Sequence, residues 1–235
     1  MNASQKVVVV TGASQGIGAE VVKAFRKLDY RVVATSRSIK PSDDPNIVTV
    51  AGDIGDPATA QRVLSEAIAR FGRIDTLVNN AGIYIGKPFT ENTIDDYNAV
   101  MNVNMAGFFH ITQRAIEAMK KHASGHVVTV TASIDNGITG AHTALAAMTK
   151  GGLNAVTRAL AIEYAPEGIR FNAVAPGVTN TPMHAAEHHD ILGSFHPLGR
   201  MGEASEIADA ILYLDSAGFV TGEVLHVDGG QAAGH

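Results

Sequence analysis

Short runs of Val and Ile alternate along this chain with longer stretches in which apolar residues recur every three to four positions. The short runs have the length and composition of buried β-strands, and the longer stretches have the period of amphipathic helices. Strands that alternate with helices in this way predict βαβ units and therefore a parallel sheet. The seven strands that we expect span residues 6–10, 31–35, 47–50, 74–78, 126–131, 169–175 and 223–227.

The stretches between these strands are expected to form helices. Apolar residues lie at helical spacing from Val21 to Leu28 and from Val63 to Phe71. Longer helices are expected from about 97 to 122, from 146 to 165 and from 203 to 216. Strands and helices together predict a doubly wound, Rossmann-type α/β fold, a seven-stranded parallel sheet with helices on both faces. Ligands of such sheets bind beyond the carboxyl ends of the strands, so candidate site residues are sought there.

Composition narrows the class of protein further. The chain has 235 residues, of which 46% are hydrophobic and 17% charged, as in ordinary globular proteins. No linker or internal repeat divides it, so residues 1–235 are interpreted as one domain. The net charge of −5 and the absence of a basic run argue against a nucleic-acid partner, and the lack of cysteine excludes disulfides and thiolate metal sites. The amino-terminal apolar run is too short for a signal peptide or a membrane span, so we expect a cytoplasmic protein without a membrane partner.

A glycine-rich turn follows the first expected strand. The stretch VVVVTGASQGIGAEVVKAF places Gly12, Gly16 and Gly18 between that strand and the first helix. Without Cβ atoms these glycines permit a tight turn and a close backbone approach to a pyrophosphate, which then meets the N–H groups at the start of the helix. The turn therefore predicts a dinucleotide site.

The spacing of this turn, TGxxxGxG, resembles that of the short-chain dehydrogenase/reductase family. The resemblance continues in order along almost the whole chain. The further matching segments are Asp53-Ile54, NNAG at 79–82, NVN at 102–104, Ser133, Lys150, PGVTNT at 176–181, HPLGRMGEASEIA at 196–208 and TGEVLHVDGG at 221–230. The family binds a nicotinamide dinucleotide and interconverts carbonyls and alcohols.

The resemblance implies a role for each matching position in cofactor binding. Asp53 accepts from the adenine amino group, Asn80 to Gly82 pass along the ribose, and Pro176 to Val178 with Thr181 hold the nicotinamide carboxamide, whereas Asn79 braces the sheet. The residues implied to bind the cofactor are Gly12, Ser14, Gln15, Gly16, Ile17, Gly18, Ser36, Arg37, Asp53, Ile54, Asn80, Ala81, Gly82, Lys150, Pro176, Gly177, Val178 and Thr181.

The end of the second strand bears on the choice between NAD(H) and NADP(H). An acidic side chain there accepts from the ribose 2′-hydroxyl and repels a 2′-phosphate. This chain has Ser36 in the usual acidic place, followed by Arg37, whose guanidinium suits a phosphate. NADP(H) is therefore preferred over NAD(H). Two points count against the preference, because Arg37 can also be a solvated surface charge and relatives that use NADP often carry a basic residue where Gln15 stands.

The resemblance also implies a catalytic set with one gap. In the family a serine polarises the substrate oxygen, a tyrosine transfers its proton, a lysine lowers the pKa of the tyrosine and binds the nicotinamide ribose, and an asparagine feeds a water relay. Ser133, Lys150 and Asn104 match three of these residues, but the tyrosine position, four residues before the lysine, holds Ala146. A positioned general acid accelerates a reaction by about 10²–10⁴-fold, so its loss matters.

Three residues are considered as a replacement proton donor. His142 lies four residues before Ala146 and reaches the same face if the helix already begins there. Tyr84 follows the NNAG segment, and Asp135 would serve only if burial raised its pKa. We select His142 as the fourth catalytic candidate, although each of the three residues also has an ordinary explanation at a cap, in packing or in a turn.

The segment after PGVTNT closes the substrate pocket in the family, and here it spans about 183–198. It is short, which favours small polar substrates over steroids. His184, His188, His189 and His196 cluster in it, and His184 and His188 have the i,i+4 spacing of metal ligands on a helix. No thiolate or clear carboxylate completes a metal site, so we predict none.

Two functions remain open. The first is an NADP(H)-dependent oxidoreductase that interconverts a carbonyl and an alcohol on a small substrate with a non-standard proton donor. The second is a catalytically silent cofactor-binding protein used for sensing or assembly. Relatives pair through their long helices and last strand, so a homodimer or homotetramer is expected.

Overall fold

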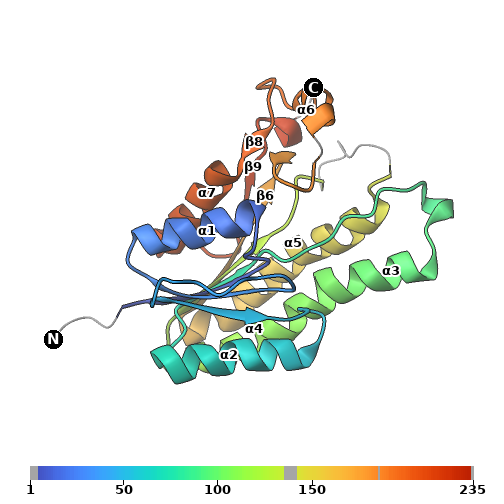
Figure 1. The fold of residues 1–235 in the computed structure, drawn as a ribbon. Helices are drawn as coiled ribbons and strands as arrows, with labels where there is room; N and C mark the ends of the chain where they lie inside the picture. The colour runs from blue at the N-terminus through green and yellow to red at the C-terminus, as the bar shows by residue number, and fades with distance from the viewer. Residues whose placement is uncertain (1–4, 135–141, 185, 234–235) are drawn as a thin grey trace.

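The computed structural model describes residues 5–134, 142–184 and 186–233. A parallel sheet of seven strands in the order β3-β2-β1-β4-β5-β6-β9 forms its centre. The prediction of a doubly wound α/β fold with seven parallel strands is confirmed (Figure 1). The strands are β1 Val7–Thr11, β2 Arg31–Ser36, β3 Ile47–Ala51, β4 Thr76–Asn79, β5 Gly125–Val130, β6 Ile169–Pro176 and β9 Val224–Val227.

Helices cover both faces of the sheet. In Figure 1, α1 and α7 lie on one face, and α2, α4 and α5 on the other. The helices are α1 Gly16–Lys27, α2 Pro57–Phe71, α3 Ile94–Met101, α4 Gly107–Lys120, α5 Ala144–Tyr164, α6 His189–Gly193 and α7 Ala204–Ser216. Short 3₁₀ turns span Phe89–Glu91, Ala165–Glu167, Ala186–His188 and Gln231–Ala233, and a two-residue ladder joins β7 Thr179–Asn180 to β8 Gly202–Glu203. None of the described helices combines the length and apolar composition of a membrane span.

The continuous apolar run of β1 reflects its place in the middle of the sheet. Val8 and Val10 pack in the cluster on the side of α1 and α7, and Val9 packs in the cluster on the opposite side. All three side chains are fully buried. Side chains alternate across a strand, so a strand covered by helices on both faces is apolar at every position.

The single helix predicted over 97–122 is wrong in one respect. The structure has α3, then a π-helical turn over Asn102–Ala106, and then α4. Because all three parts are helical, the apolar pattern predicted one continuous helix where the structure has three segments. π turns inside helices are rare and occur mostly at functional sites, and this one carries Asn104.

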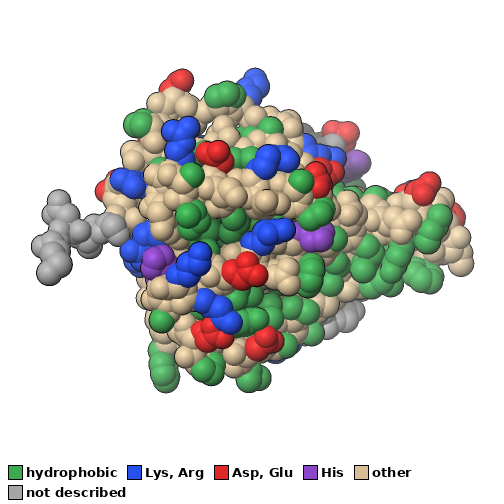
Figure 2. Space-filling view, turned by 90° about the horizontal axis from the view of Figure 1, so that it is seen from below, with side chains coloured by type: hydrophobic (Ala, Val, Ile, Leu, Met, Phe, Trp, Pro, Cys, Tyr) green, Lys and Arg blue, Asp and Glu red, His purple; other side chains and the backbone are tan. Residues whose placement is uncertain are grey.

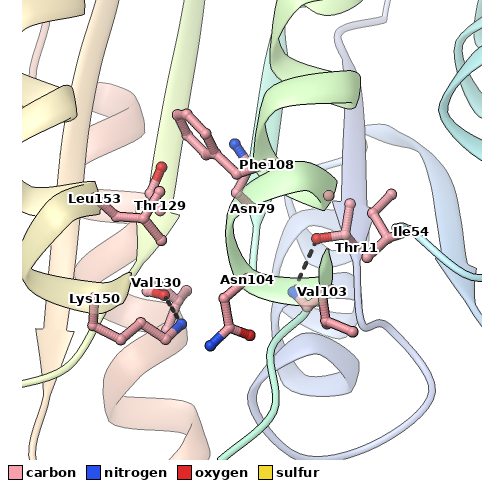
Figure 3. A pocket seen from close by; sticks show the side chains of 12 residues that line it. Thr11, Ile54, Asn79, Val103, Asn104, Phe108, Thr129, Val130, Lys150 and Leu153 are labelled. Atoms are coloured by element: carbon pink, nitrogen blue, oxygen red, sulfur yellow. Dashed lines mark hydrogen bonds between the residues drawn. The ribbon is translucent and has the colours of Figure 1, made fainter. Parts of the chain in front are cut away.

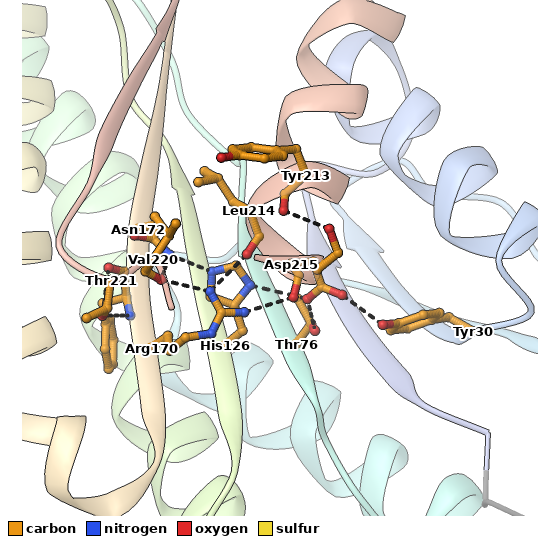
Figure 4. Close-up of polar contacts among 12 residues, drawn as sticks. Tyr30, Thr76, His126, Arg170, Asn172, Tyr213, Leu214, Asp215, Val220 and Thr221 are labelled. Atoms are coloured by element: carbon orange, nitrogen blue, oxygen red, sulfur yellow. Dashed lines mark hydrogen bonds and ion pairs between the residues drawn. The ribbon is translucent and has the colours of Figure 1, made fainter. Parts of the chain in front are cut away.

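A buried polar network ties the amino ends of the strands together, opposite the glycine-rich turn. Asp215, at the end of α7, accepts from Thr76 Oγ1 at 2.6 Å and from Tyr30 Oη at 2.7 Å, and its Oδ1 lies 3.2 Å from Nδ1 of His126 (Figure 4). Arg170 donates to the backbone carbonyl of Asp215 at 2.8 Å. The network links β4, β5 and β6 to α7 at the edge of the sheet that carries no candidate site.

Candidate active site

One large cavity, of about 680 Å³, lies at the carboxyl edge of the sheet. Of the residues predicted to bind the cofactor, Gly18 does not line it and all the others do. The lining members of that set are Gly12, Ser14, Gln15, Gly16, Ile17, Ser36, Arg37, Asp53, Ile54, Asn80, Ala81, Gly82, Lys150, Pro176, Gly177, Val178 and Thr181. Residues from five strand ends and two helices thus meet around a single space.

The glycine-rich turn approaches its neighbours so closely that side chains are excluded. Gly12 has φ +64°, and a Cβ there would lie 2.8 Å from Nδ2 of Asn80. A Cβ on Gly18 would overlap the carbonyl oxygen of Gly12. Gly18 therefore acts by letting α1 pack against the turn, while Gly12 and Gly16 face the cavity.

Thr11, which was not among the predicted site residues, holds the end of β1 to the end of β4. Its hydroxyl accepts from the backbone N–H groups of Asn80 and Ala81, both at 3.0 Å. Asn80 returns two side-chain hydrogen bonds, to the carbonyl oxygens of Thr11 and Gly12. Asn79 donates to Thr112 at 2.9 Å, in agreement with the bracing role that the resemblance implied. The position of Thr11 at the end of a predicted strand was the sequence feature that could have identified it as a site residue.

The end of the cavity that the family resemblance assigns to the adenine, called the adenine end below, lies beyond β2 and β3. Arg37 and Asp53 are both exposed there, and Oδ1 of Asp53 accepts from the backbone N–H of Gly55 at 2.9 Å. The hydroxyl oxygen of Ser36 is buried and has no hydrogen-bond partner in the part of the chain that the structure describes. A buried hydroxyl without a partner is costly in a folded protein.

Lys150 and Asn104 meet behind the large cavity. Nζ of Lys150 donates to the carbonyl oxygen of Val130 at 2.8 Å, and burial lowers the pKa of Lys150 to about 8. Asn104 accepts from the backbone N–H of Ile83 at 2.9 Å and donates to Thr149 Oγ1 at 3.2 Å. Both side chains point into a second, small cavity of about 10 Å³, about the room that one water molecule needs (Figure 3).

Ser133 lines the large cavity, but its hydroxyl is already committed. It donates to Oδ2 of Asp228 at 2.5 Å, and the side chain of Ser133 is buried. A serine has one hydroxyl proton, which cannot serve Asp228 and a substrate oxygen together. The predicted polarising role of Ser133 therefore conflicts with its observed hydrogen bond. Asp228 was not selected, although it directly follows β9, a position that could have drawn attention to it.

The start of α5 corrects the prediction for His142. The helix begins at Ala144, and His142 lies before it with φ +71°, an unusual backbone state for a residue other than glycine. His142 is exposed and does not line the cavity, whereas Ala146 does. Its side chain therefore does not share a helical face with Ala146. Tyr84 lines the cavity, and its hydroxyl donates to the carbonyl oxygen of His142 at 3.3 Å. Asp135 lies outside the described residues.

The segment at about 183–198, called the lid below, holds the clustered histidines. They do not form the helical pair that their spacing suggested. His184 precedes the 3₁₀ turn, and α6 begins only at His189, so His184 and His188 share no helix. His184 lines the cavity, and burial and the neighbouring His189 lower its pKa. Among the described residues, no group of three or more His, Asp or Glu side chains is placed to hold a metal ion.

His196 has a different environment from the other lid histidines. It is buried, and its Nε2 accepts from the backbone N–H of Val178 at 2.9 Å. Its Nδ1 lies 3.3 Å from the carbonyl oxygen of Gly193. A neutral imidazole that carries its proton on Nδ1 satisfies both contacts. His196 thus ties the lid to the loop that follows β6.

The walls beyond Lys150 are mostly apolar. The described residues that line this end of the cavity include Ile83, Tyr84, Ile134, Ala146, Met183, Leu192 and Phe195. Among the described lining residues the carboxylate and guanidinium groups, Asp53 and Arg37, lie at the adenine end. Ser133, Thr143 and His184 also line the cavity, so the walls combine apolar surface with a few polar groups, and the small polar substrate stays a prediction.

Comparisons with known proteins agree with this architecture. A family model described as enoyl-(acyl carrier protein) reductase matches residues 12–232. The chain is 34% identical to 3beta-hydroxysteroid dehydrogenase 1 of Eggerthella lenta, over 96% of this chain and 93% of that protein. Its fold is similar to that of ElxO with NADP bound, with a TM-score of 0.91 and 32% identity over 98% of this chain and 100% of ElxO. It is also similar to a 3-ketoacyl-(acyl-carrier-protein) reductase from Brucella melitensis complexed with NADH, with a TM-score of 0.89 and 29% identity over 98% and 100% of the two chains.

Proposed function

The chain belongs to the short-chain dehydrogenase/reductase family, and on that premise we propose that it is an NADP(H)-dependent oxidoreductase that interconverts a carbonyl and an alcohol on a small substrate with apolar flanks. The observation that carries the proposal is that Lys150 and the other expected dinucleotide residues, with the exception of Gly18, line one cavity. The proton donor is non-standard, because Ala146 stands at the position that the family resemblance gives to a tyrosine.

The residues present fit a dinucleotide. The bare backbone at Gly12 and Gly16 leaves room for a pyrophosphate at the start of α1, and both glycines have positive φ. The hydroxyl of Ser36, which has no hydrogen-bond partner among the described residues, and the exposed Arg37 lie where a ribose and its 2′ substituent would sit. When bound in its reduced form, the nicotinamide supplies the hydride that the substrate carbon takes.

The choice of NADP(H) rests on the side chains after β2. Arg37 offers a planar guanidinium to a 2′-phosphate, and Ser36 carries no charge to repel one. Of the similar structures, ElxO has NADP bound and the Brucella melitensis reductase is complexed with NADH. The two relatives differ in cofactor, so the local charge at Arg37 decides our preference.

The second candidate function is a silent cofactor-binding protein. The observation that favours it is the loss of two proton donors at the substrate end. Ala146 has no acidic proton, and the hydroxyl of Ser133 donates to Asp228. The dinucleotide residues are untouched by these losses, so such a protein would bind the cofactor without turning over a substrate.

NADPH oxidation by the purified protein, measured over a panel of small ketones, aldehydes and quinones, separates the two functions. NADPH binding is measured in parallel by fluorescence, and Lys150→Ala serves as the background. An oxidoreductase consumes NADPH with at least one member of the panel well above the Lys150→Ala rate. If NADPH binds and no member is reduced above that rate, the silent function is the better description.

We also propose a homo-oligomer. Phe109 on α4 and Ile162 on α5 expose 57% and 79% of their surfaces, and exposed apolar side chains that gather into a patch mark interaction sites. Figure 2 shows further hydrophobic side chains on the projection built by α3 and the turn before it, where Phe89 and Ile94 are exposed. The oligomeric state is measured by light scattering, and Ile162→Glu is expected to weaken the association.

A further inference from the structure

We propose that Lys150 itself gives the proton to the substrate oxygen, across the space that Ala146 leaves open beside it. This inference rests on the proposed function and deepens it by naming the acid. It assigns Lys150 a catalytic role beyond holding the ribose, and it replaces His142, whose side chain lies outside the cavity.

The geometry of α5 brings Lys150 to the substrate. Ala146 and Lys150 are one helical turn apart, so they share a face, and both line the large cavity. The first turn of the helix is held in place by Thr149, whose hydroxyl bonds to the carbonyl oxygens of Leu145 and Ala146. Because the side chain of Ala146 is a single methyl group, it does not separate Lys150 from the space where a substrate would lie.

Lys150 retains protons that it can give. An ammonium group has three N–H donors, and the carbonyl oxygen of Val130 is the one acceptor that Nζ has among the described residues. Ser133 offers no proton, because its hydroxyl donates to Asp228. Among the described residues that line the cavity near Ala146, Lys150 is therefore the strongest available proton donor.

The surroundings make this ammonium more acidic than an ordinary lysine. Burial lowers the pKa of Lys150 to about 8, without any charged partner. No other residue that lines the small cavity is ionisable. Among the described residues, the other ionisable side chains that line the large cavity are Arg37 and Asp53 at the adenine end and Tyr84 and His184 at the lid side. None of these is a carboxylate near Nζ that would hold the proton on Lys150.

The proton step balances with the residues named. While the substrate carbon takes the hydride, the electron pair of the carbonyl moves to its oxygen, which forms a bond to one proton of Nζ. The N–H bond breaks, its pair stays on nitrogen, and Lys150 becomes a neutral amine. Lys150 also lines the small cavity next to Asn104, so a water-sized space lies on its other side from which a proton can be returned.

The first measurement needs no cofactor and no turnover. Trace acetylation of the apo protein with acetic anhydride between pH 6 and 11, read by mass spectrometry on the peptide that holds Lys150, gives the pH at which the amine becomes reactive. We expect a midpoint near 8 for Lys150, against about 10.4 for an ordinary lysine side chain. A midpoint at the ordinary value overturns the proposal.

The second measurement compares Ala146→Tyr with Ala146→Phe, two rings of nearly equal size. Phenylalanine fills the space without offering a proton, so kcat is expected to fall by about 10²–10⁴-fold while NADPH still binds. Tyrosine places a phenol between Lys150 and the substrate, so kcat is retained or raised. In the unchanged protein kcat for reduction should fall above pH 8, and Lys150→Arg should lose it, since a guanidinium holds its proton.

The outcomes separate this inference from the proposed function. Turnover by the unchanged protein that is flat from pH 7 to 9.5, or that survives in Ala146→Phe, overturns the role of Lys150 and leaves the oxidoreductase standing. NADPH binding without turnover in the unchanged protein, with activity appearing in Ala146→Tyr, overturns both and favours the silent function.

Discussion

The hydroxyl of Ser133 donates to Oδ2 of Asp228 across 2.5 Å, although the two residues lie 95 positions apart. Asp228 also accepts from the backbone N–H groups of Gly230 and Ala232, at 3.0 and 2.8 Å. Burial by itself raises the pKa of Asp228, but these three hydrogen bonds outweigh it and hold the pKa below its ordinary value. Asp228 is therefore an ionised acceptor that joins the end of β5 to the segment after β9.

Ser133→Ala is expected to lower stability more than catalysis. It removes the hydroxyl and leaves a buried carboxylate with one donor fewer, a cost of about 1–3 kcal/mol. Because the proton of Ser133 serves Asp228, kcat should change much less than the about 10²–10³-fold that follows removal of a transition-state donor. Urea unfolding and steady-state kinetics on the same preparation measure both effects.

Asp228→Asn is the matched control for this pair. Its amide oxygen can still accept from Ser133 and Ala232, but its NH₂ group then faces the backbone N–H of Gly230, so stability should fall while the hydroxyl of Ser133 keeps an acceptor. A Ser133→Ala protein that keeps its stability and loses two orders of magnitude in kcat would show that the hydroxyl turns toward the substrate during the reaction.

Local patterns predicted the sheet well, because a buried parallel strand such as β1 is apolar at every position and its helices carry a regular period. They could not reveal the hydrogen bond between Ser133 and Asp228, because the local sequence around each residue does not indicate a contact with a residue so far away in the chain. The π turn at Asn104 was missed because a π turn keeps the chain helical. The start of α5 depends on the positive φ of His142, for which the sequence offers no glycine as a signal.

Arg37→Ala is expected to weaken NADPH binding far more than NADH binding. A hydrogen bond to a charged group contributes about 1.5–3 kcal/mol, which corresponds to about a 10- to 100-fold rise in the Kd of NADPH. Fluorescence titration with both cofactors measures the two Kd values. Equal, small changes for both would mean that Arg37 is only a solvated surface charge.

Ser36→Asp tests the same end of the cavity from the other side. A carboxylate there accepts from a ribose 2′-hydroxyl and repels a 2′-phosphate, so the ratio of NADPH to NADH affinity should fall and NADH binding should be kept or improved. Ser36→Asn, with similar size and no charge, is the control, and it should leave the ratio closer to that of the unchanged protein.

The network around Asp215 predicts a loss of stability in acid. Burial by itself raises the pKa of Asp215, but hydrogen bonds from His126, Thr76 and Tyr30 bring it down to about 2. A carboxyl whose folded pKa lies below its unfolded value of 3.8 stabilises the fold above that value and loses this contribution as the pH falls toward 2. The contribution is on the order of 2 kcal/mol. Buried His126, whose pKa is lowered mainly by desolvation, adds a loss of stability in the same direction that begins below the ordinary histidine pKa of 6.5.

Asp215→Asn should remove the part of this pH dependence that lies below pH 4 and lower stability at pH 7. Breaking a buried pair from one side costs about 3–5 kcal/mol, and an amide that keeps some of the hydrogen bonds should cost less. Urea unfolding at pH 3, 4, 5 and 7 gives the comparison. Parallel pH curves for the two proteins would mean that Asp215 titrates normally in the folded chain.

His196 connects the lid to the loop after β6, and His196→Ala should weaken cofactor binding as well as stability. The imidazole accepts from the backbone N–H of Val178, and its Nε2 lies 2.6 Å from where a Cβ of Gly177 would be, so it packs directly on that loop. Alanine leaves the N–H without this partner and opens a space beside Gly177, which costs about 1–3 kcal/mol. Because Gly177 and Val178 line the cavity, we expect the Kd of NADPH to rise as well. His196→Gln is the informative control, since its side-chain oxygen can accept from the same N–H and should restore much of the binding. Loss of stability in His196→Ala with an unchanged Kd for NADPH would limit His196 to a structural role in the lid.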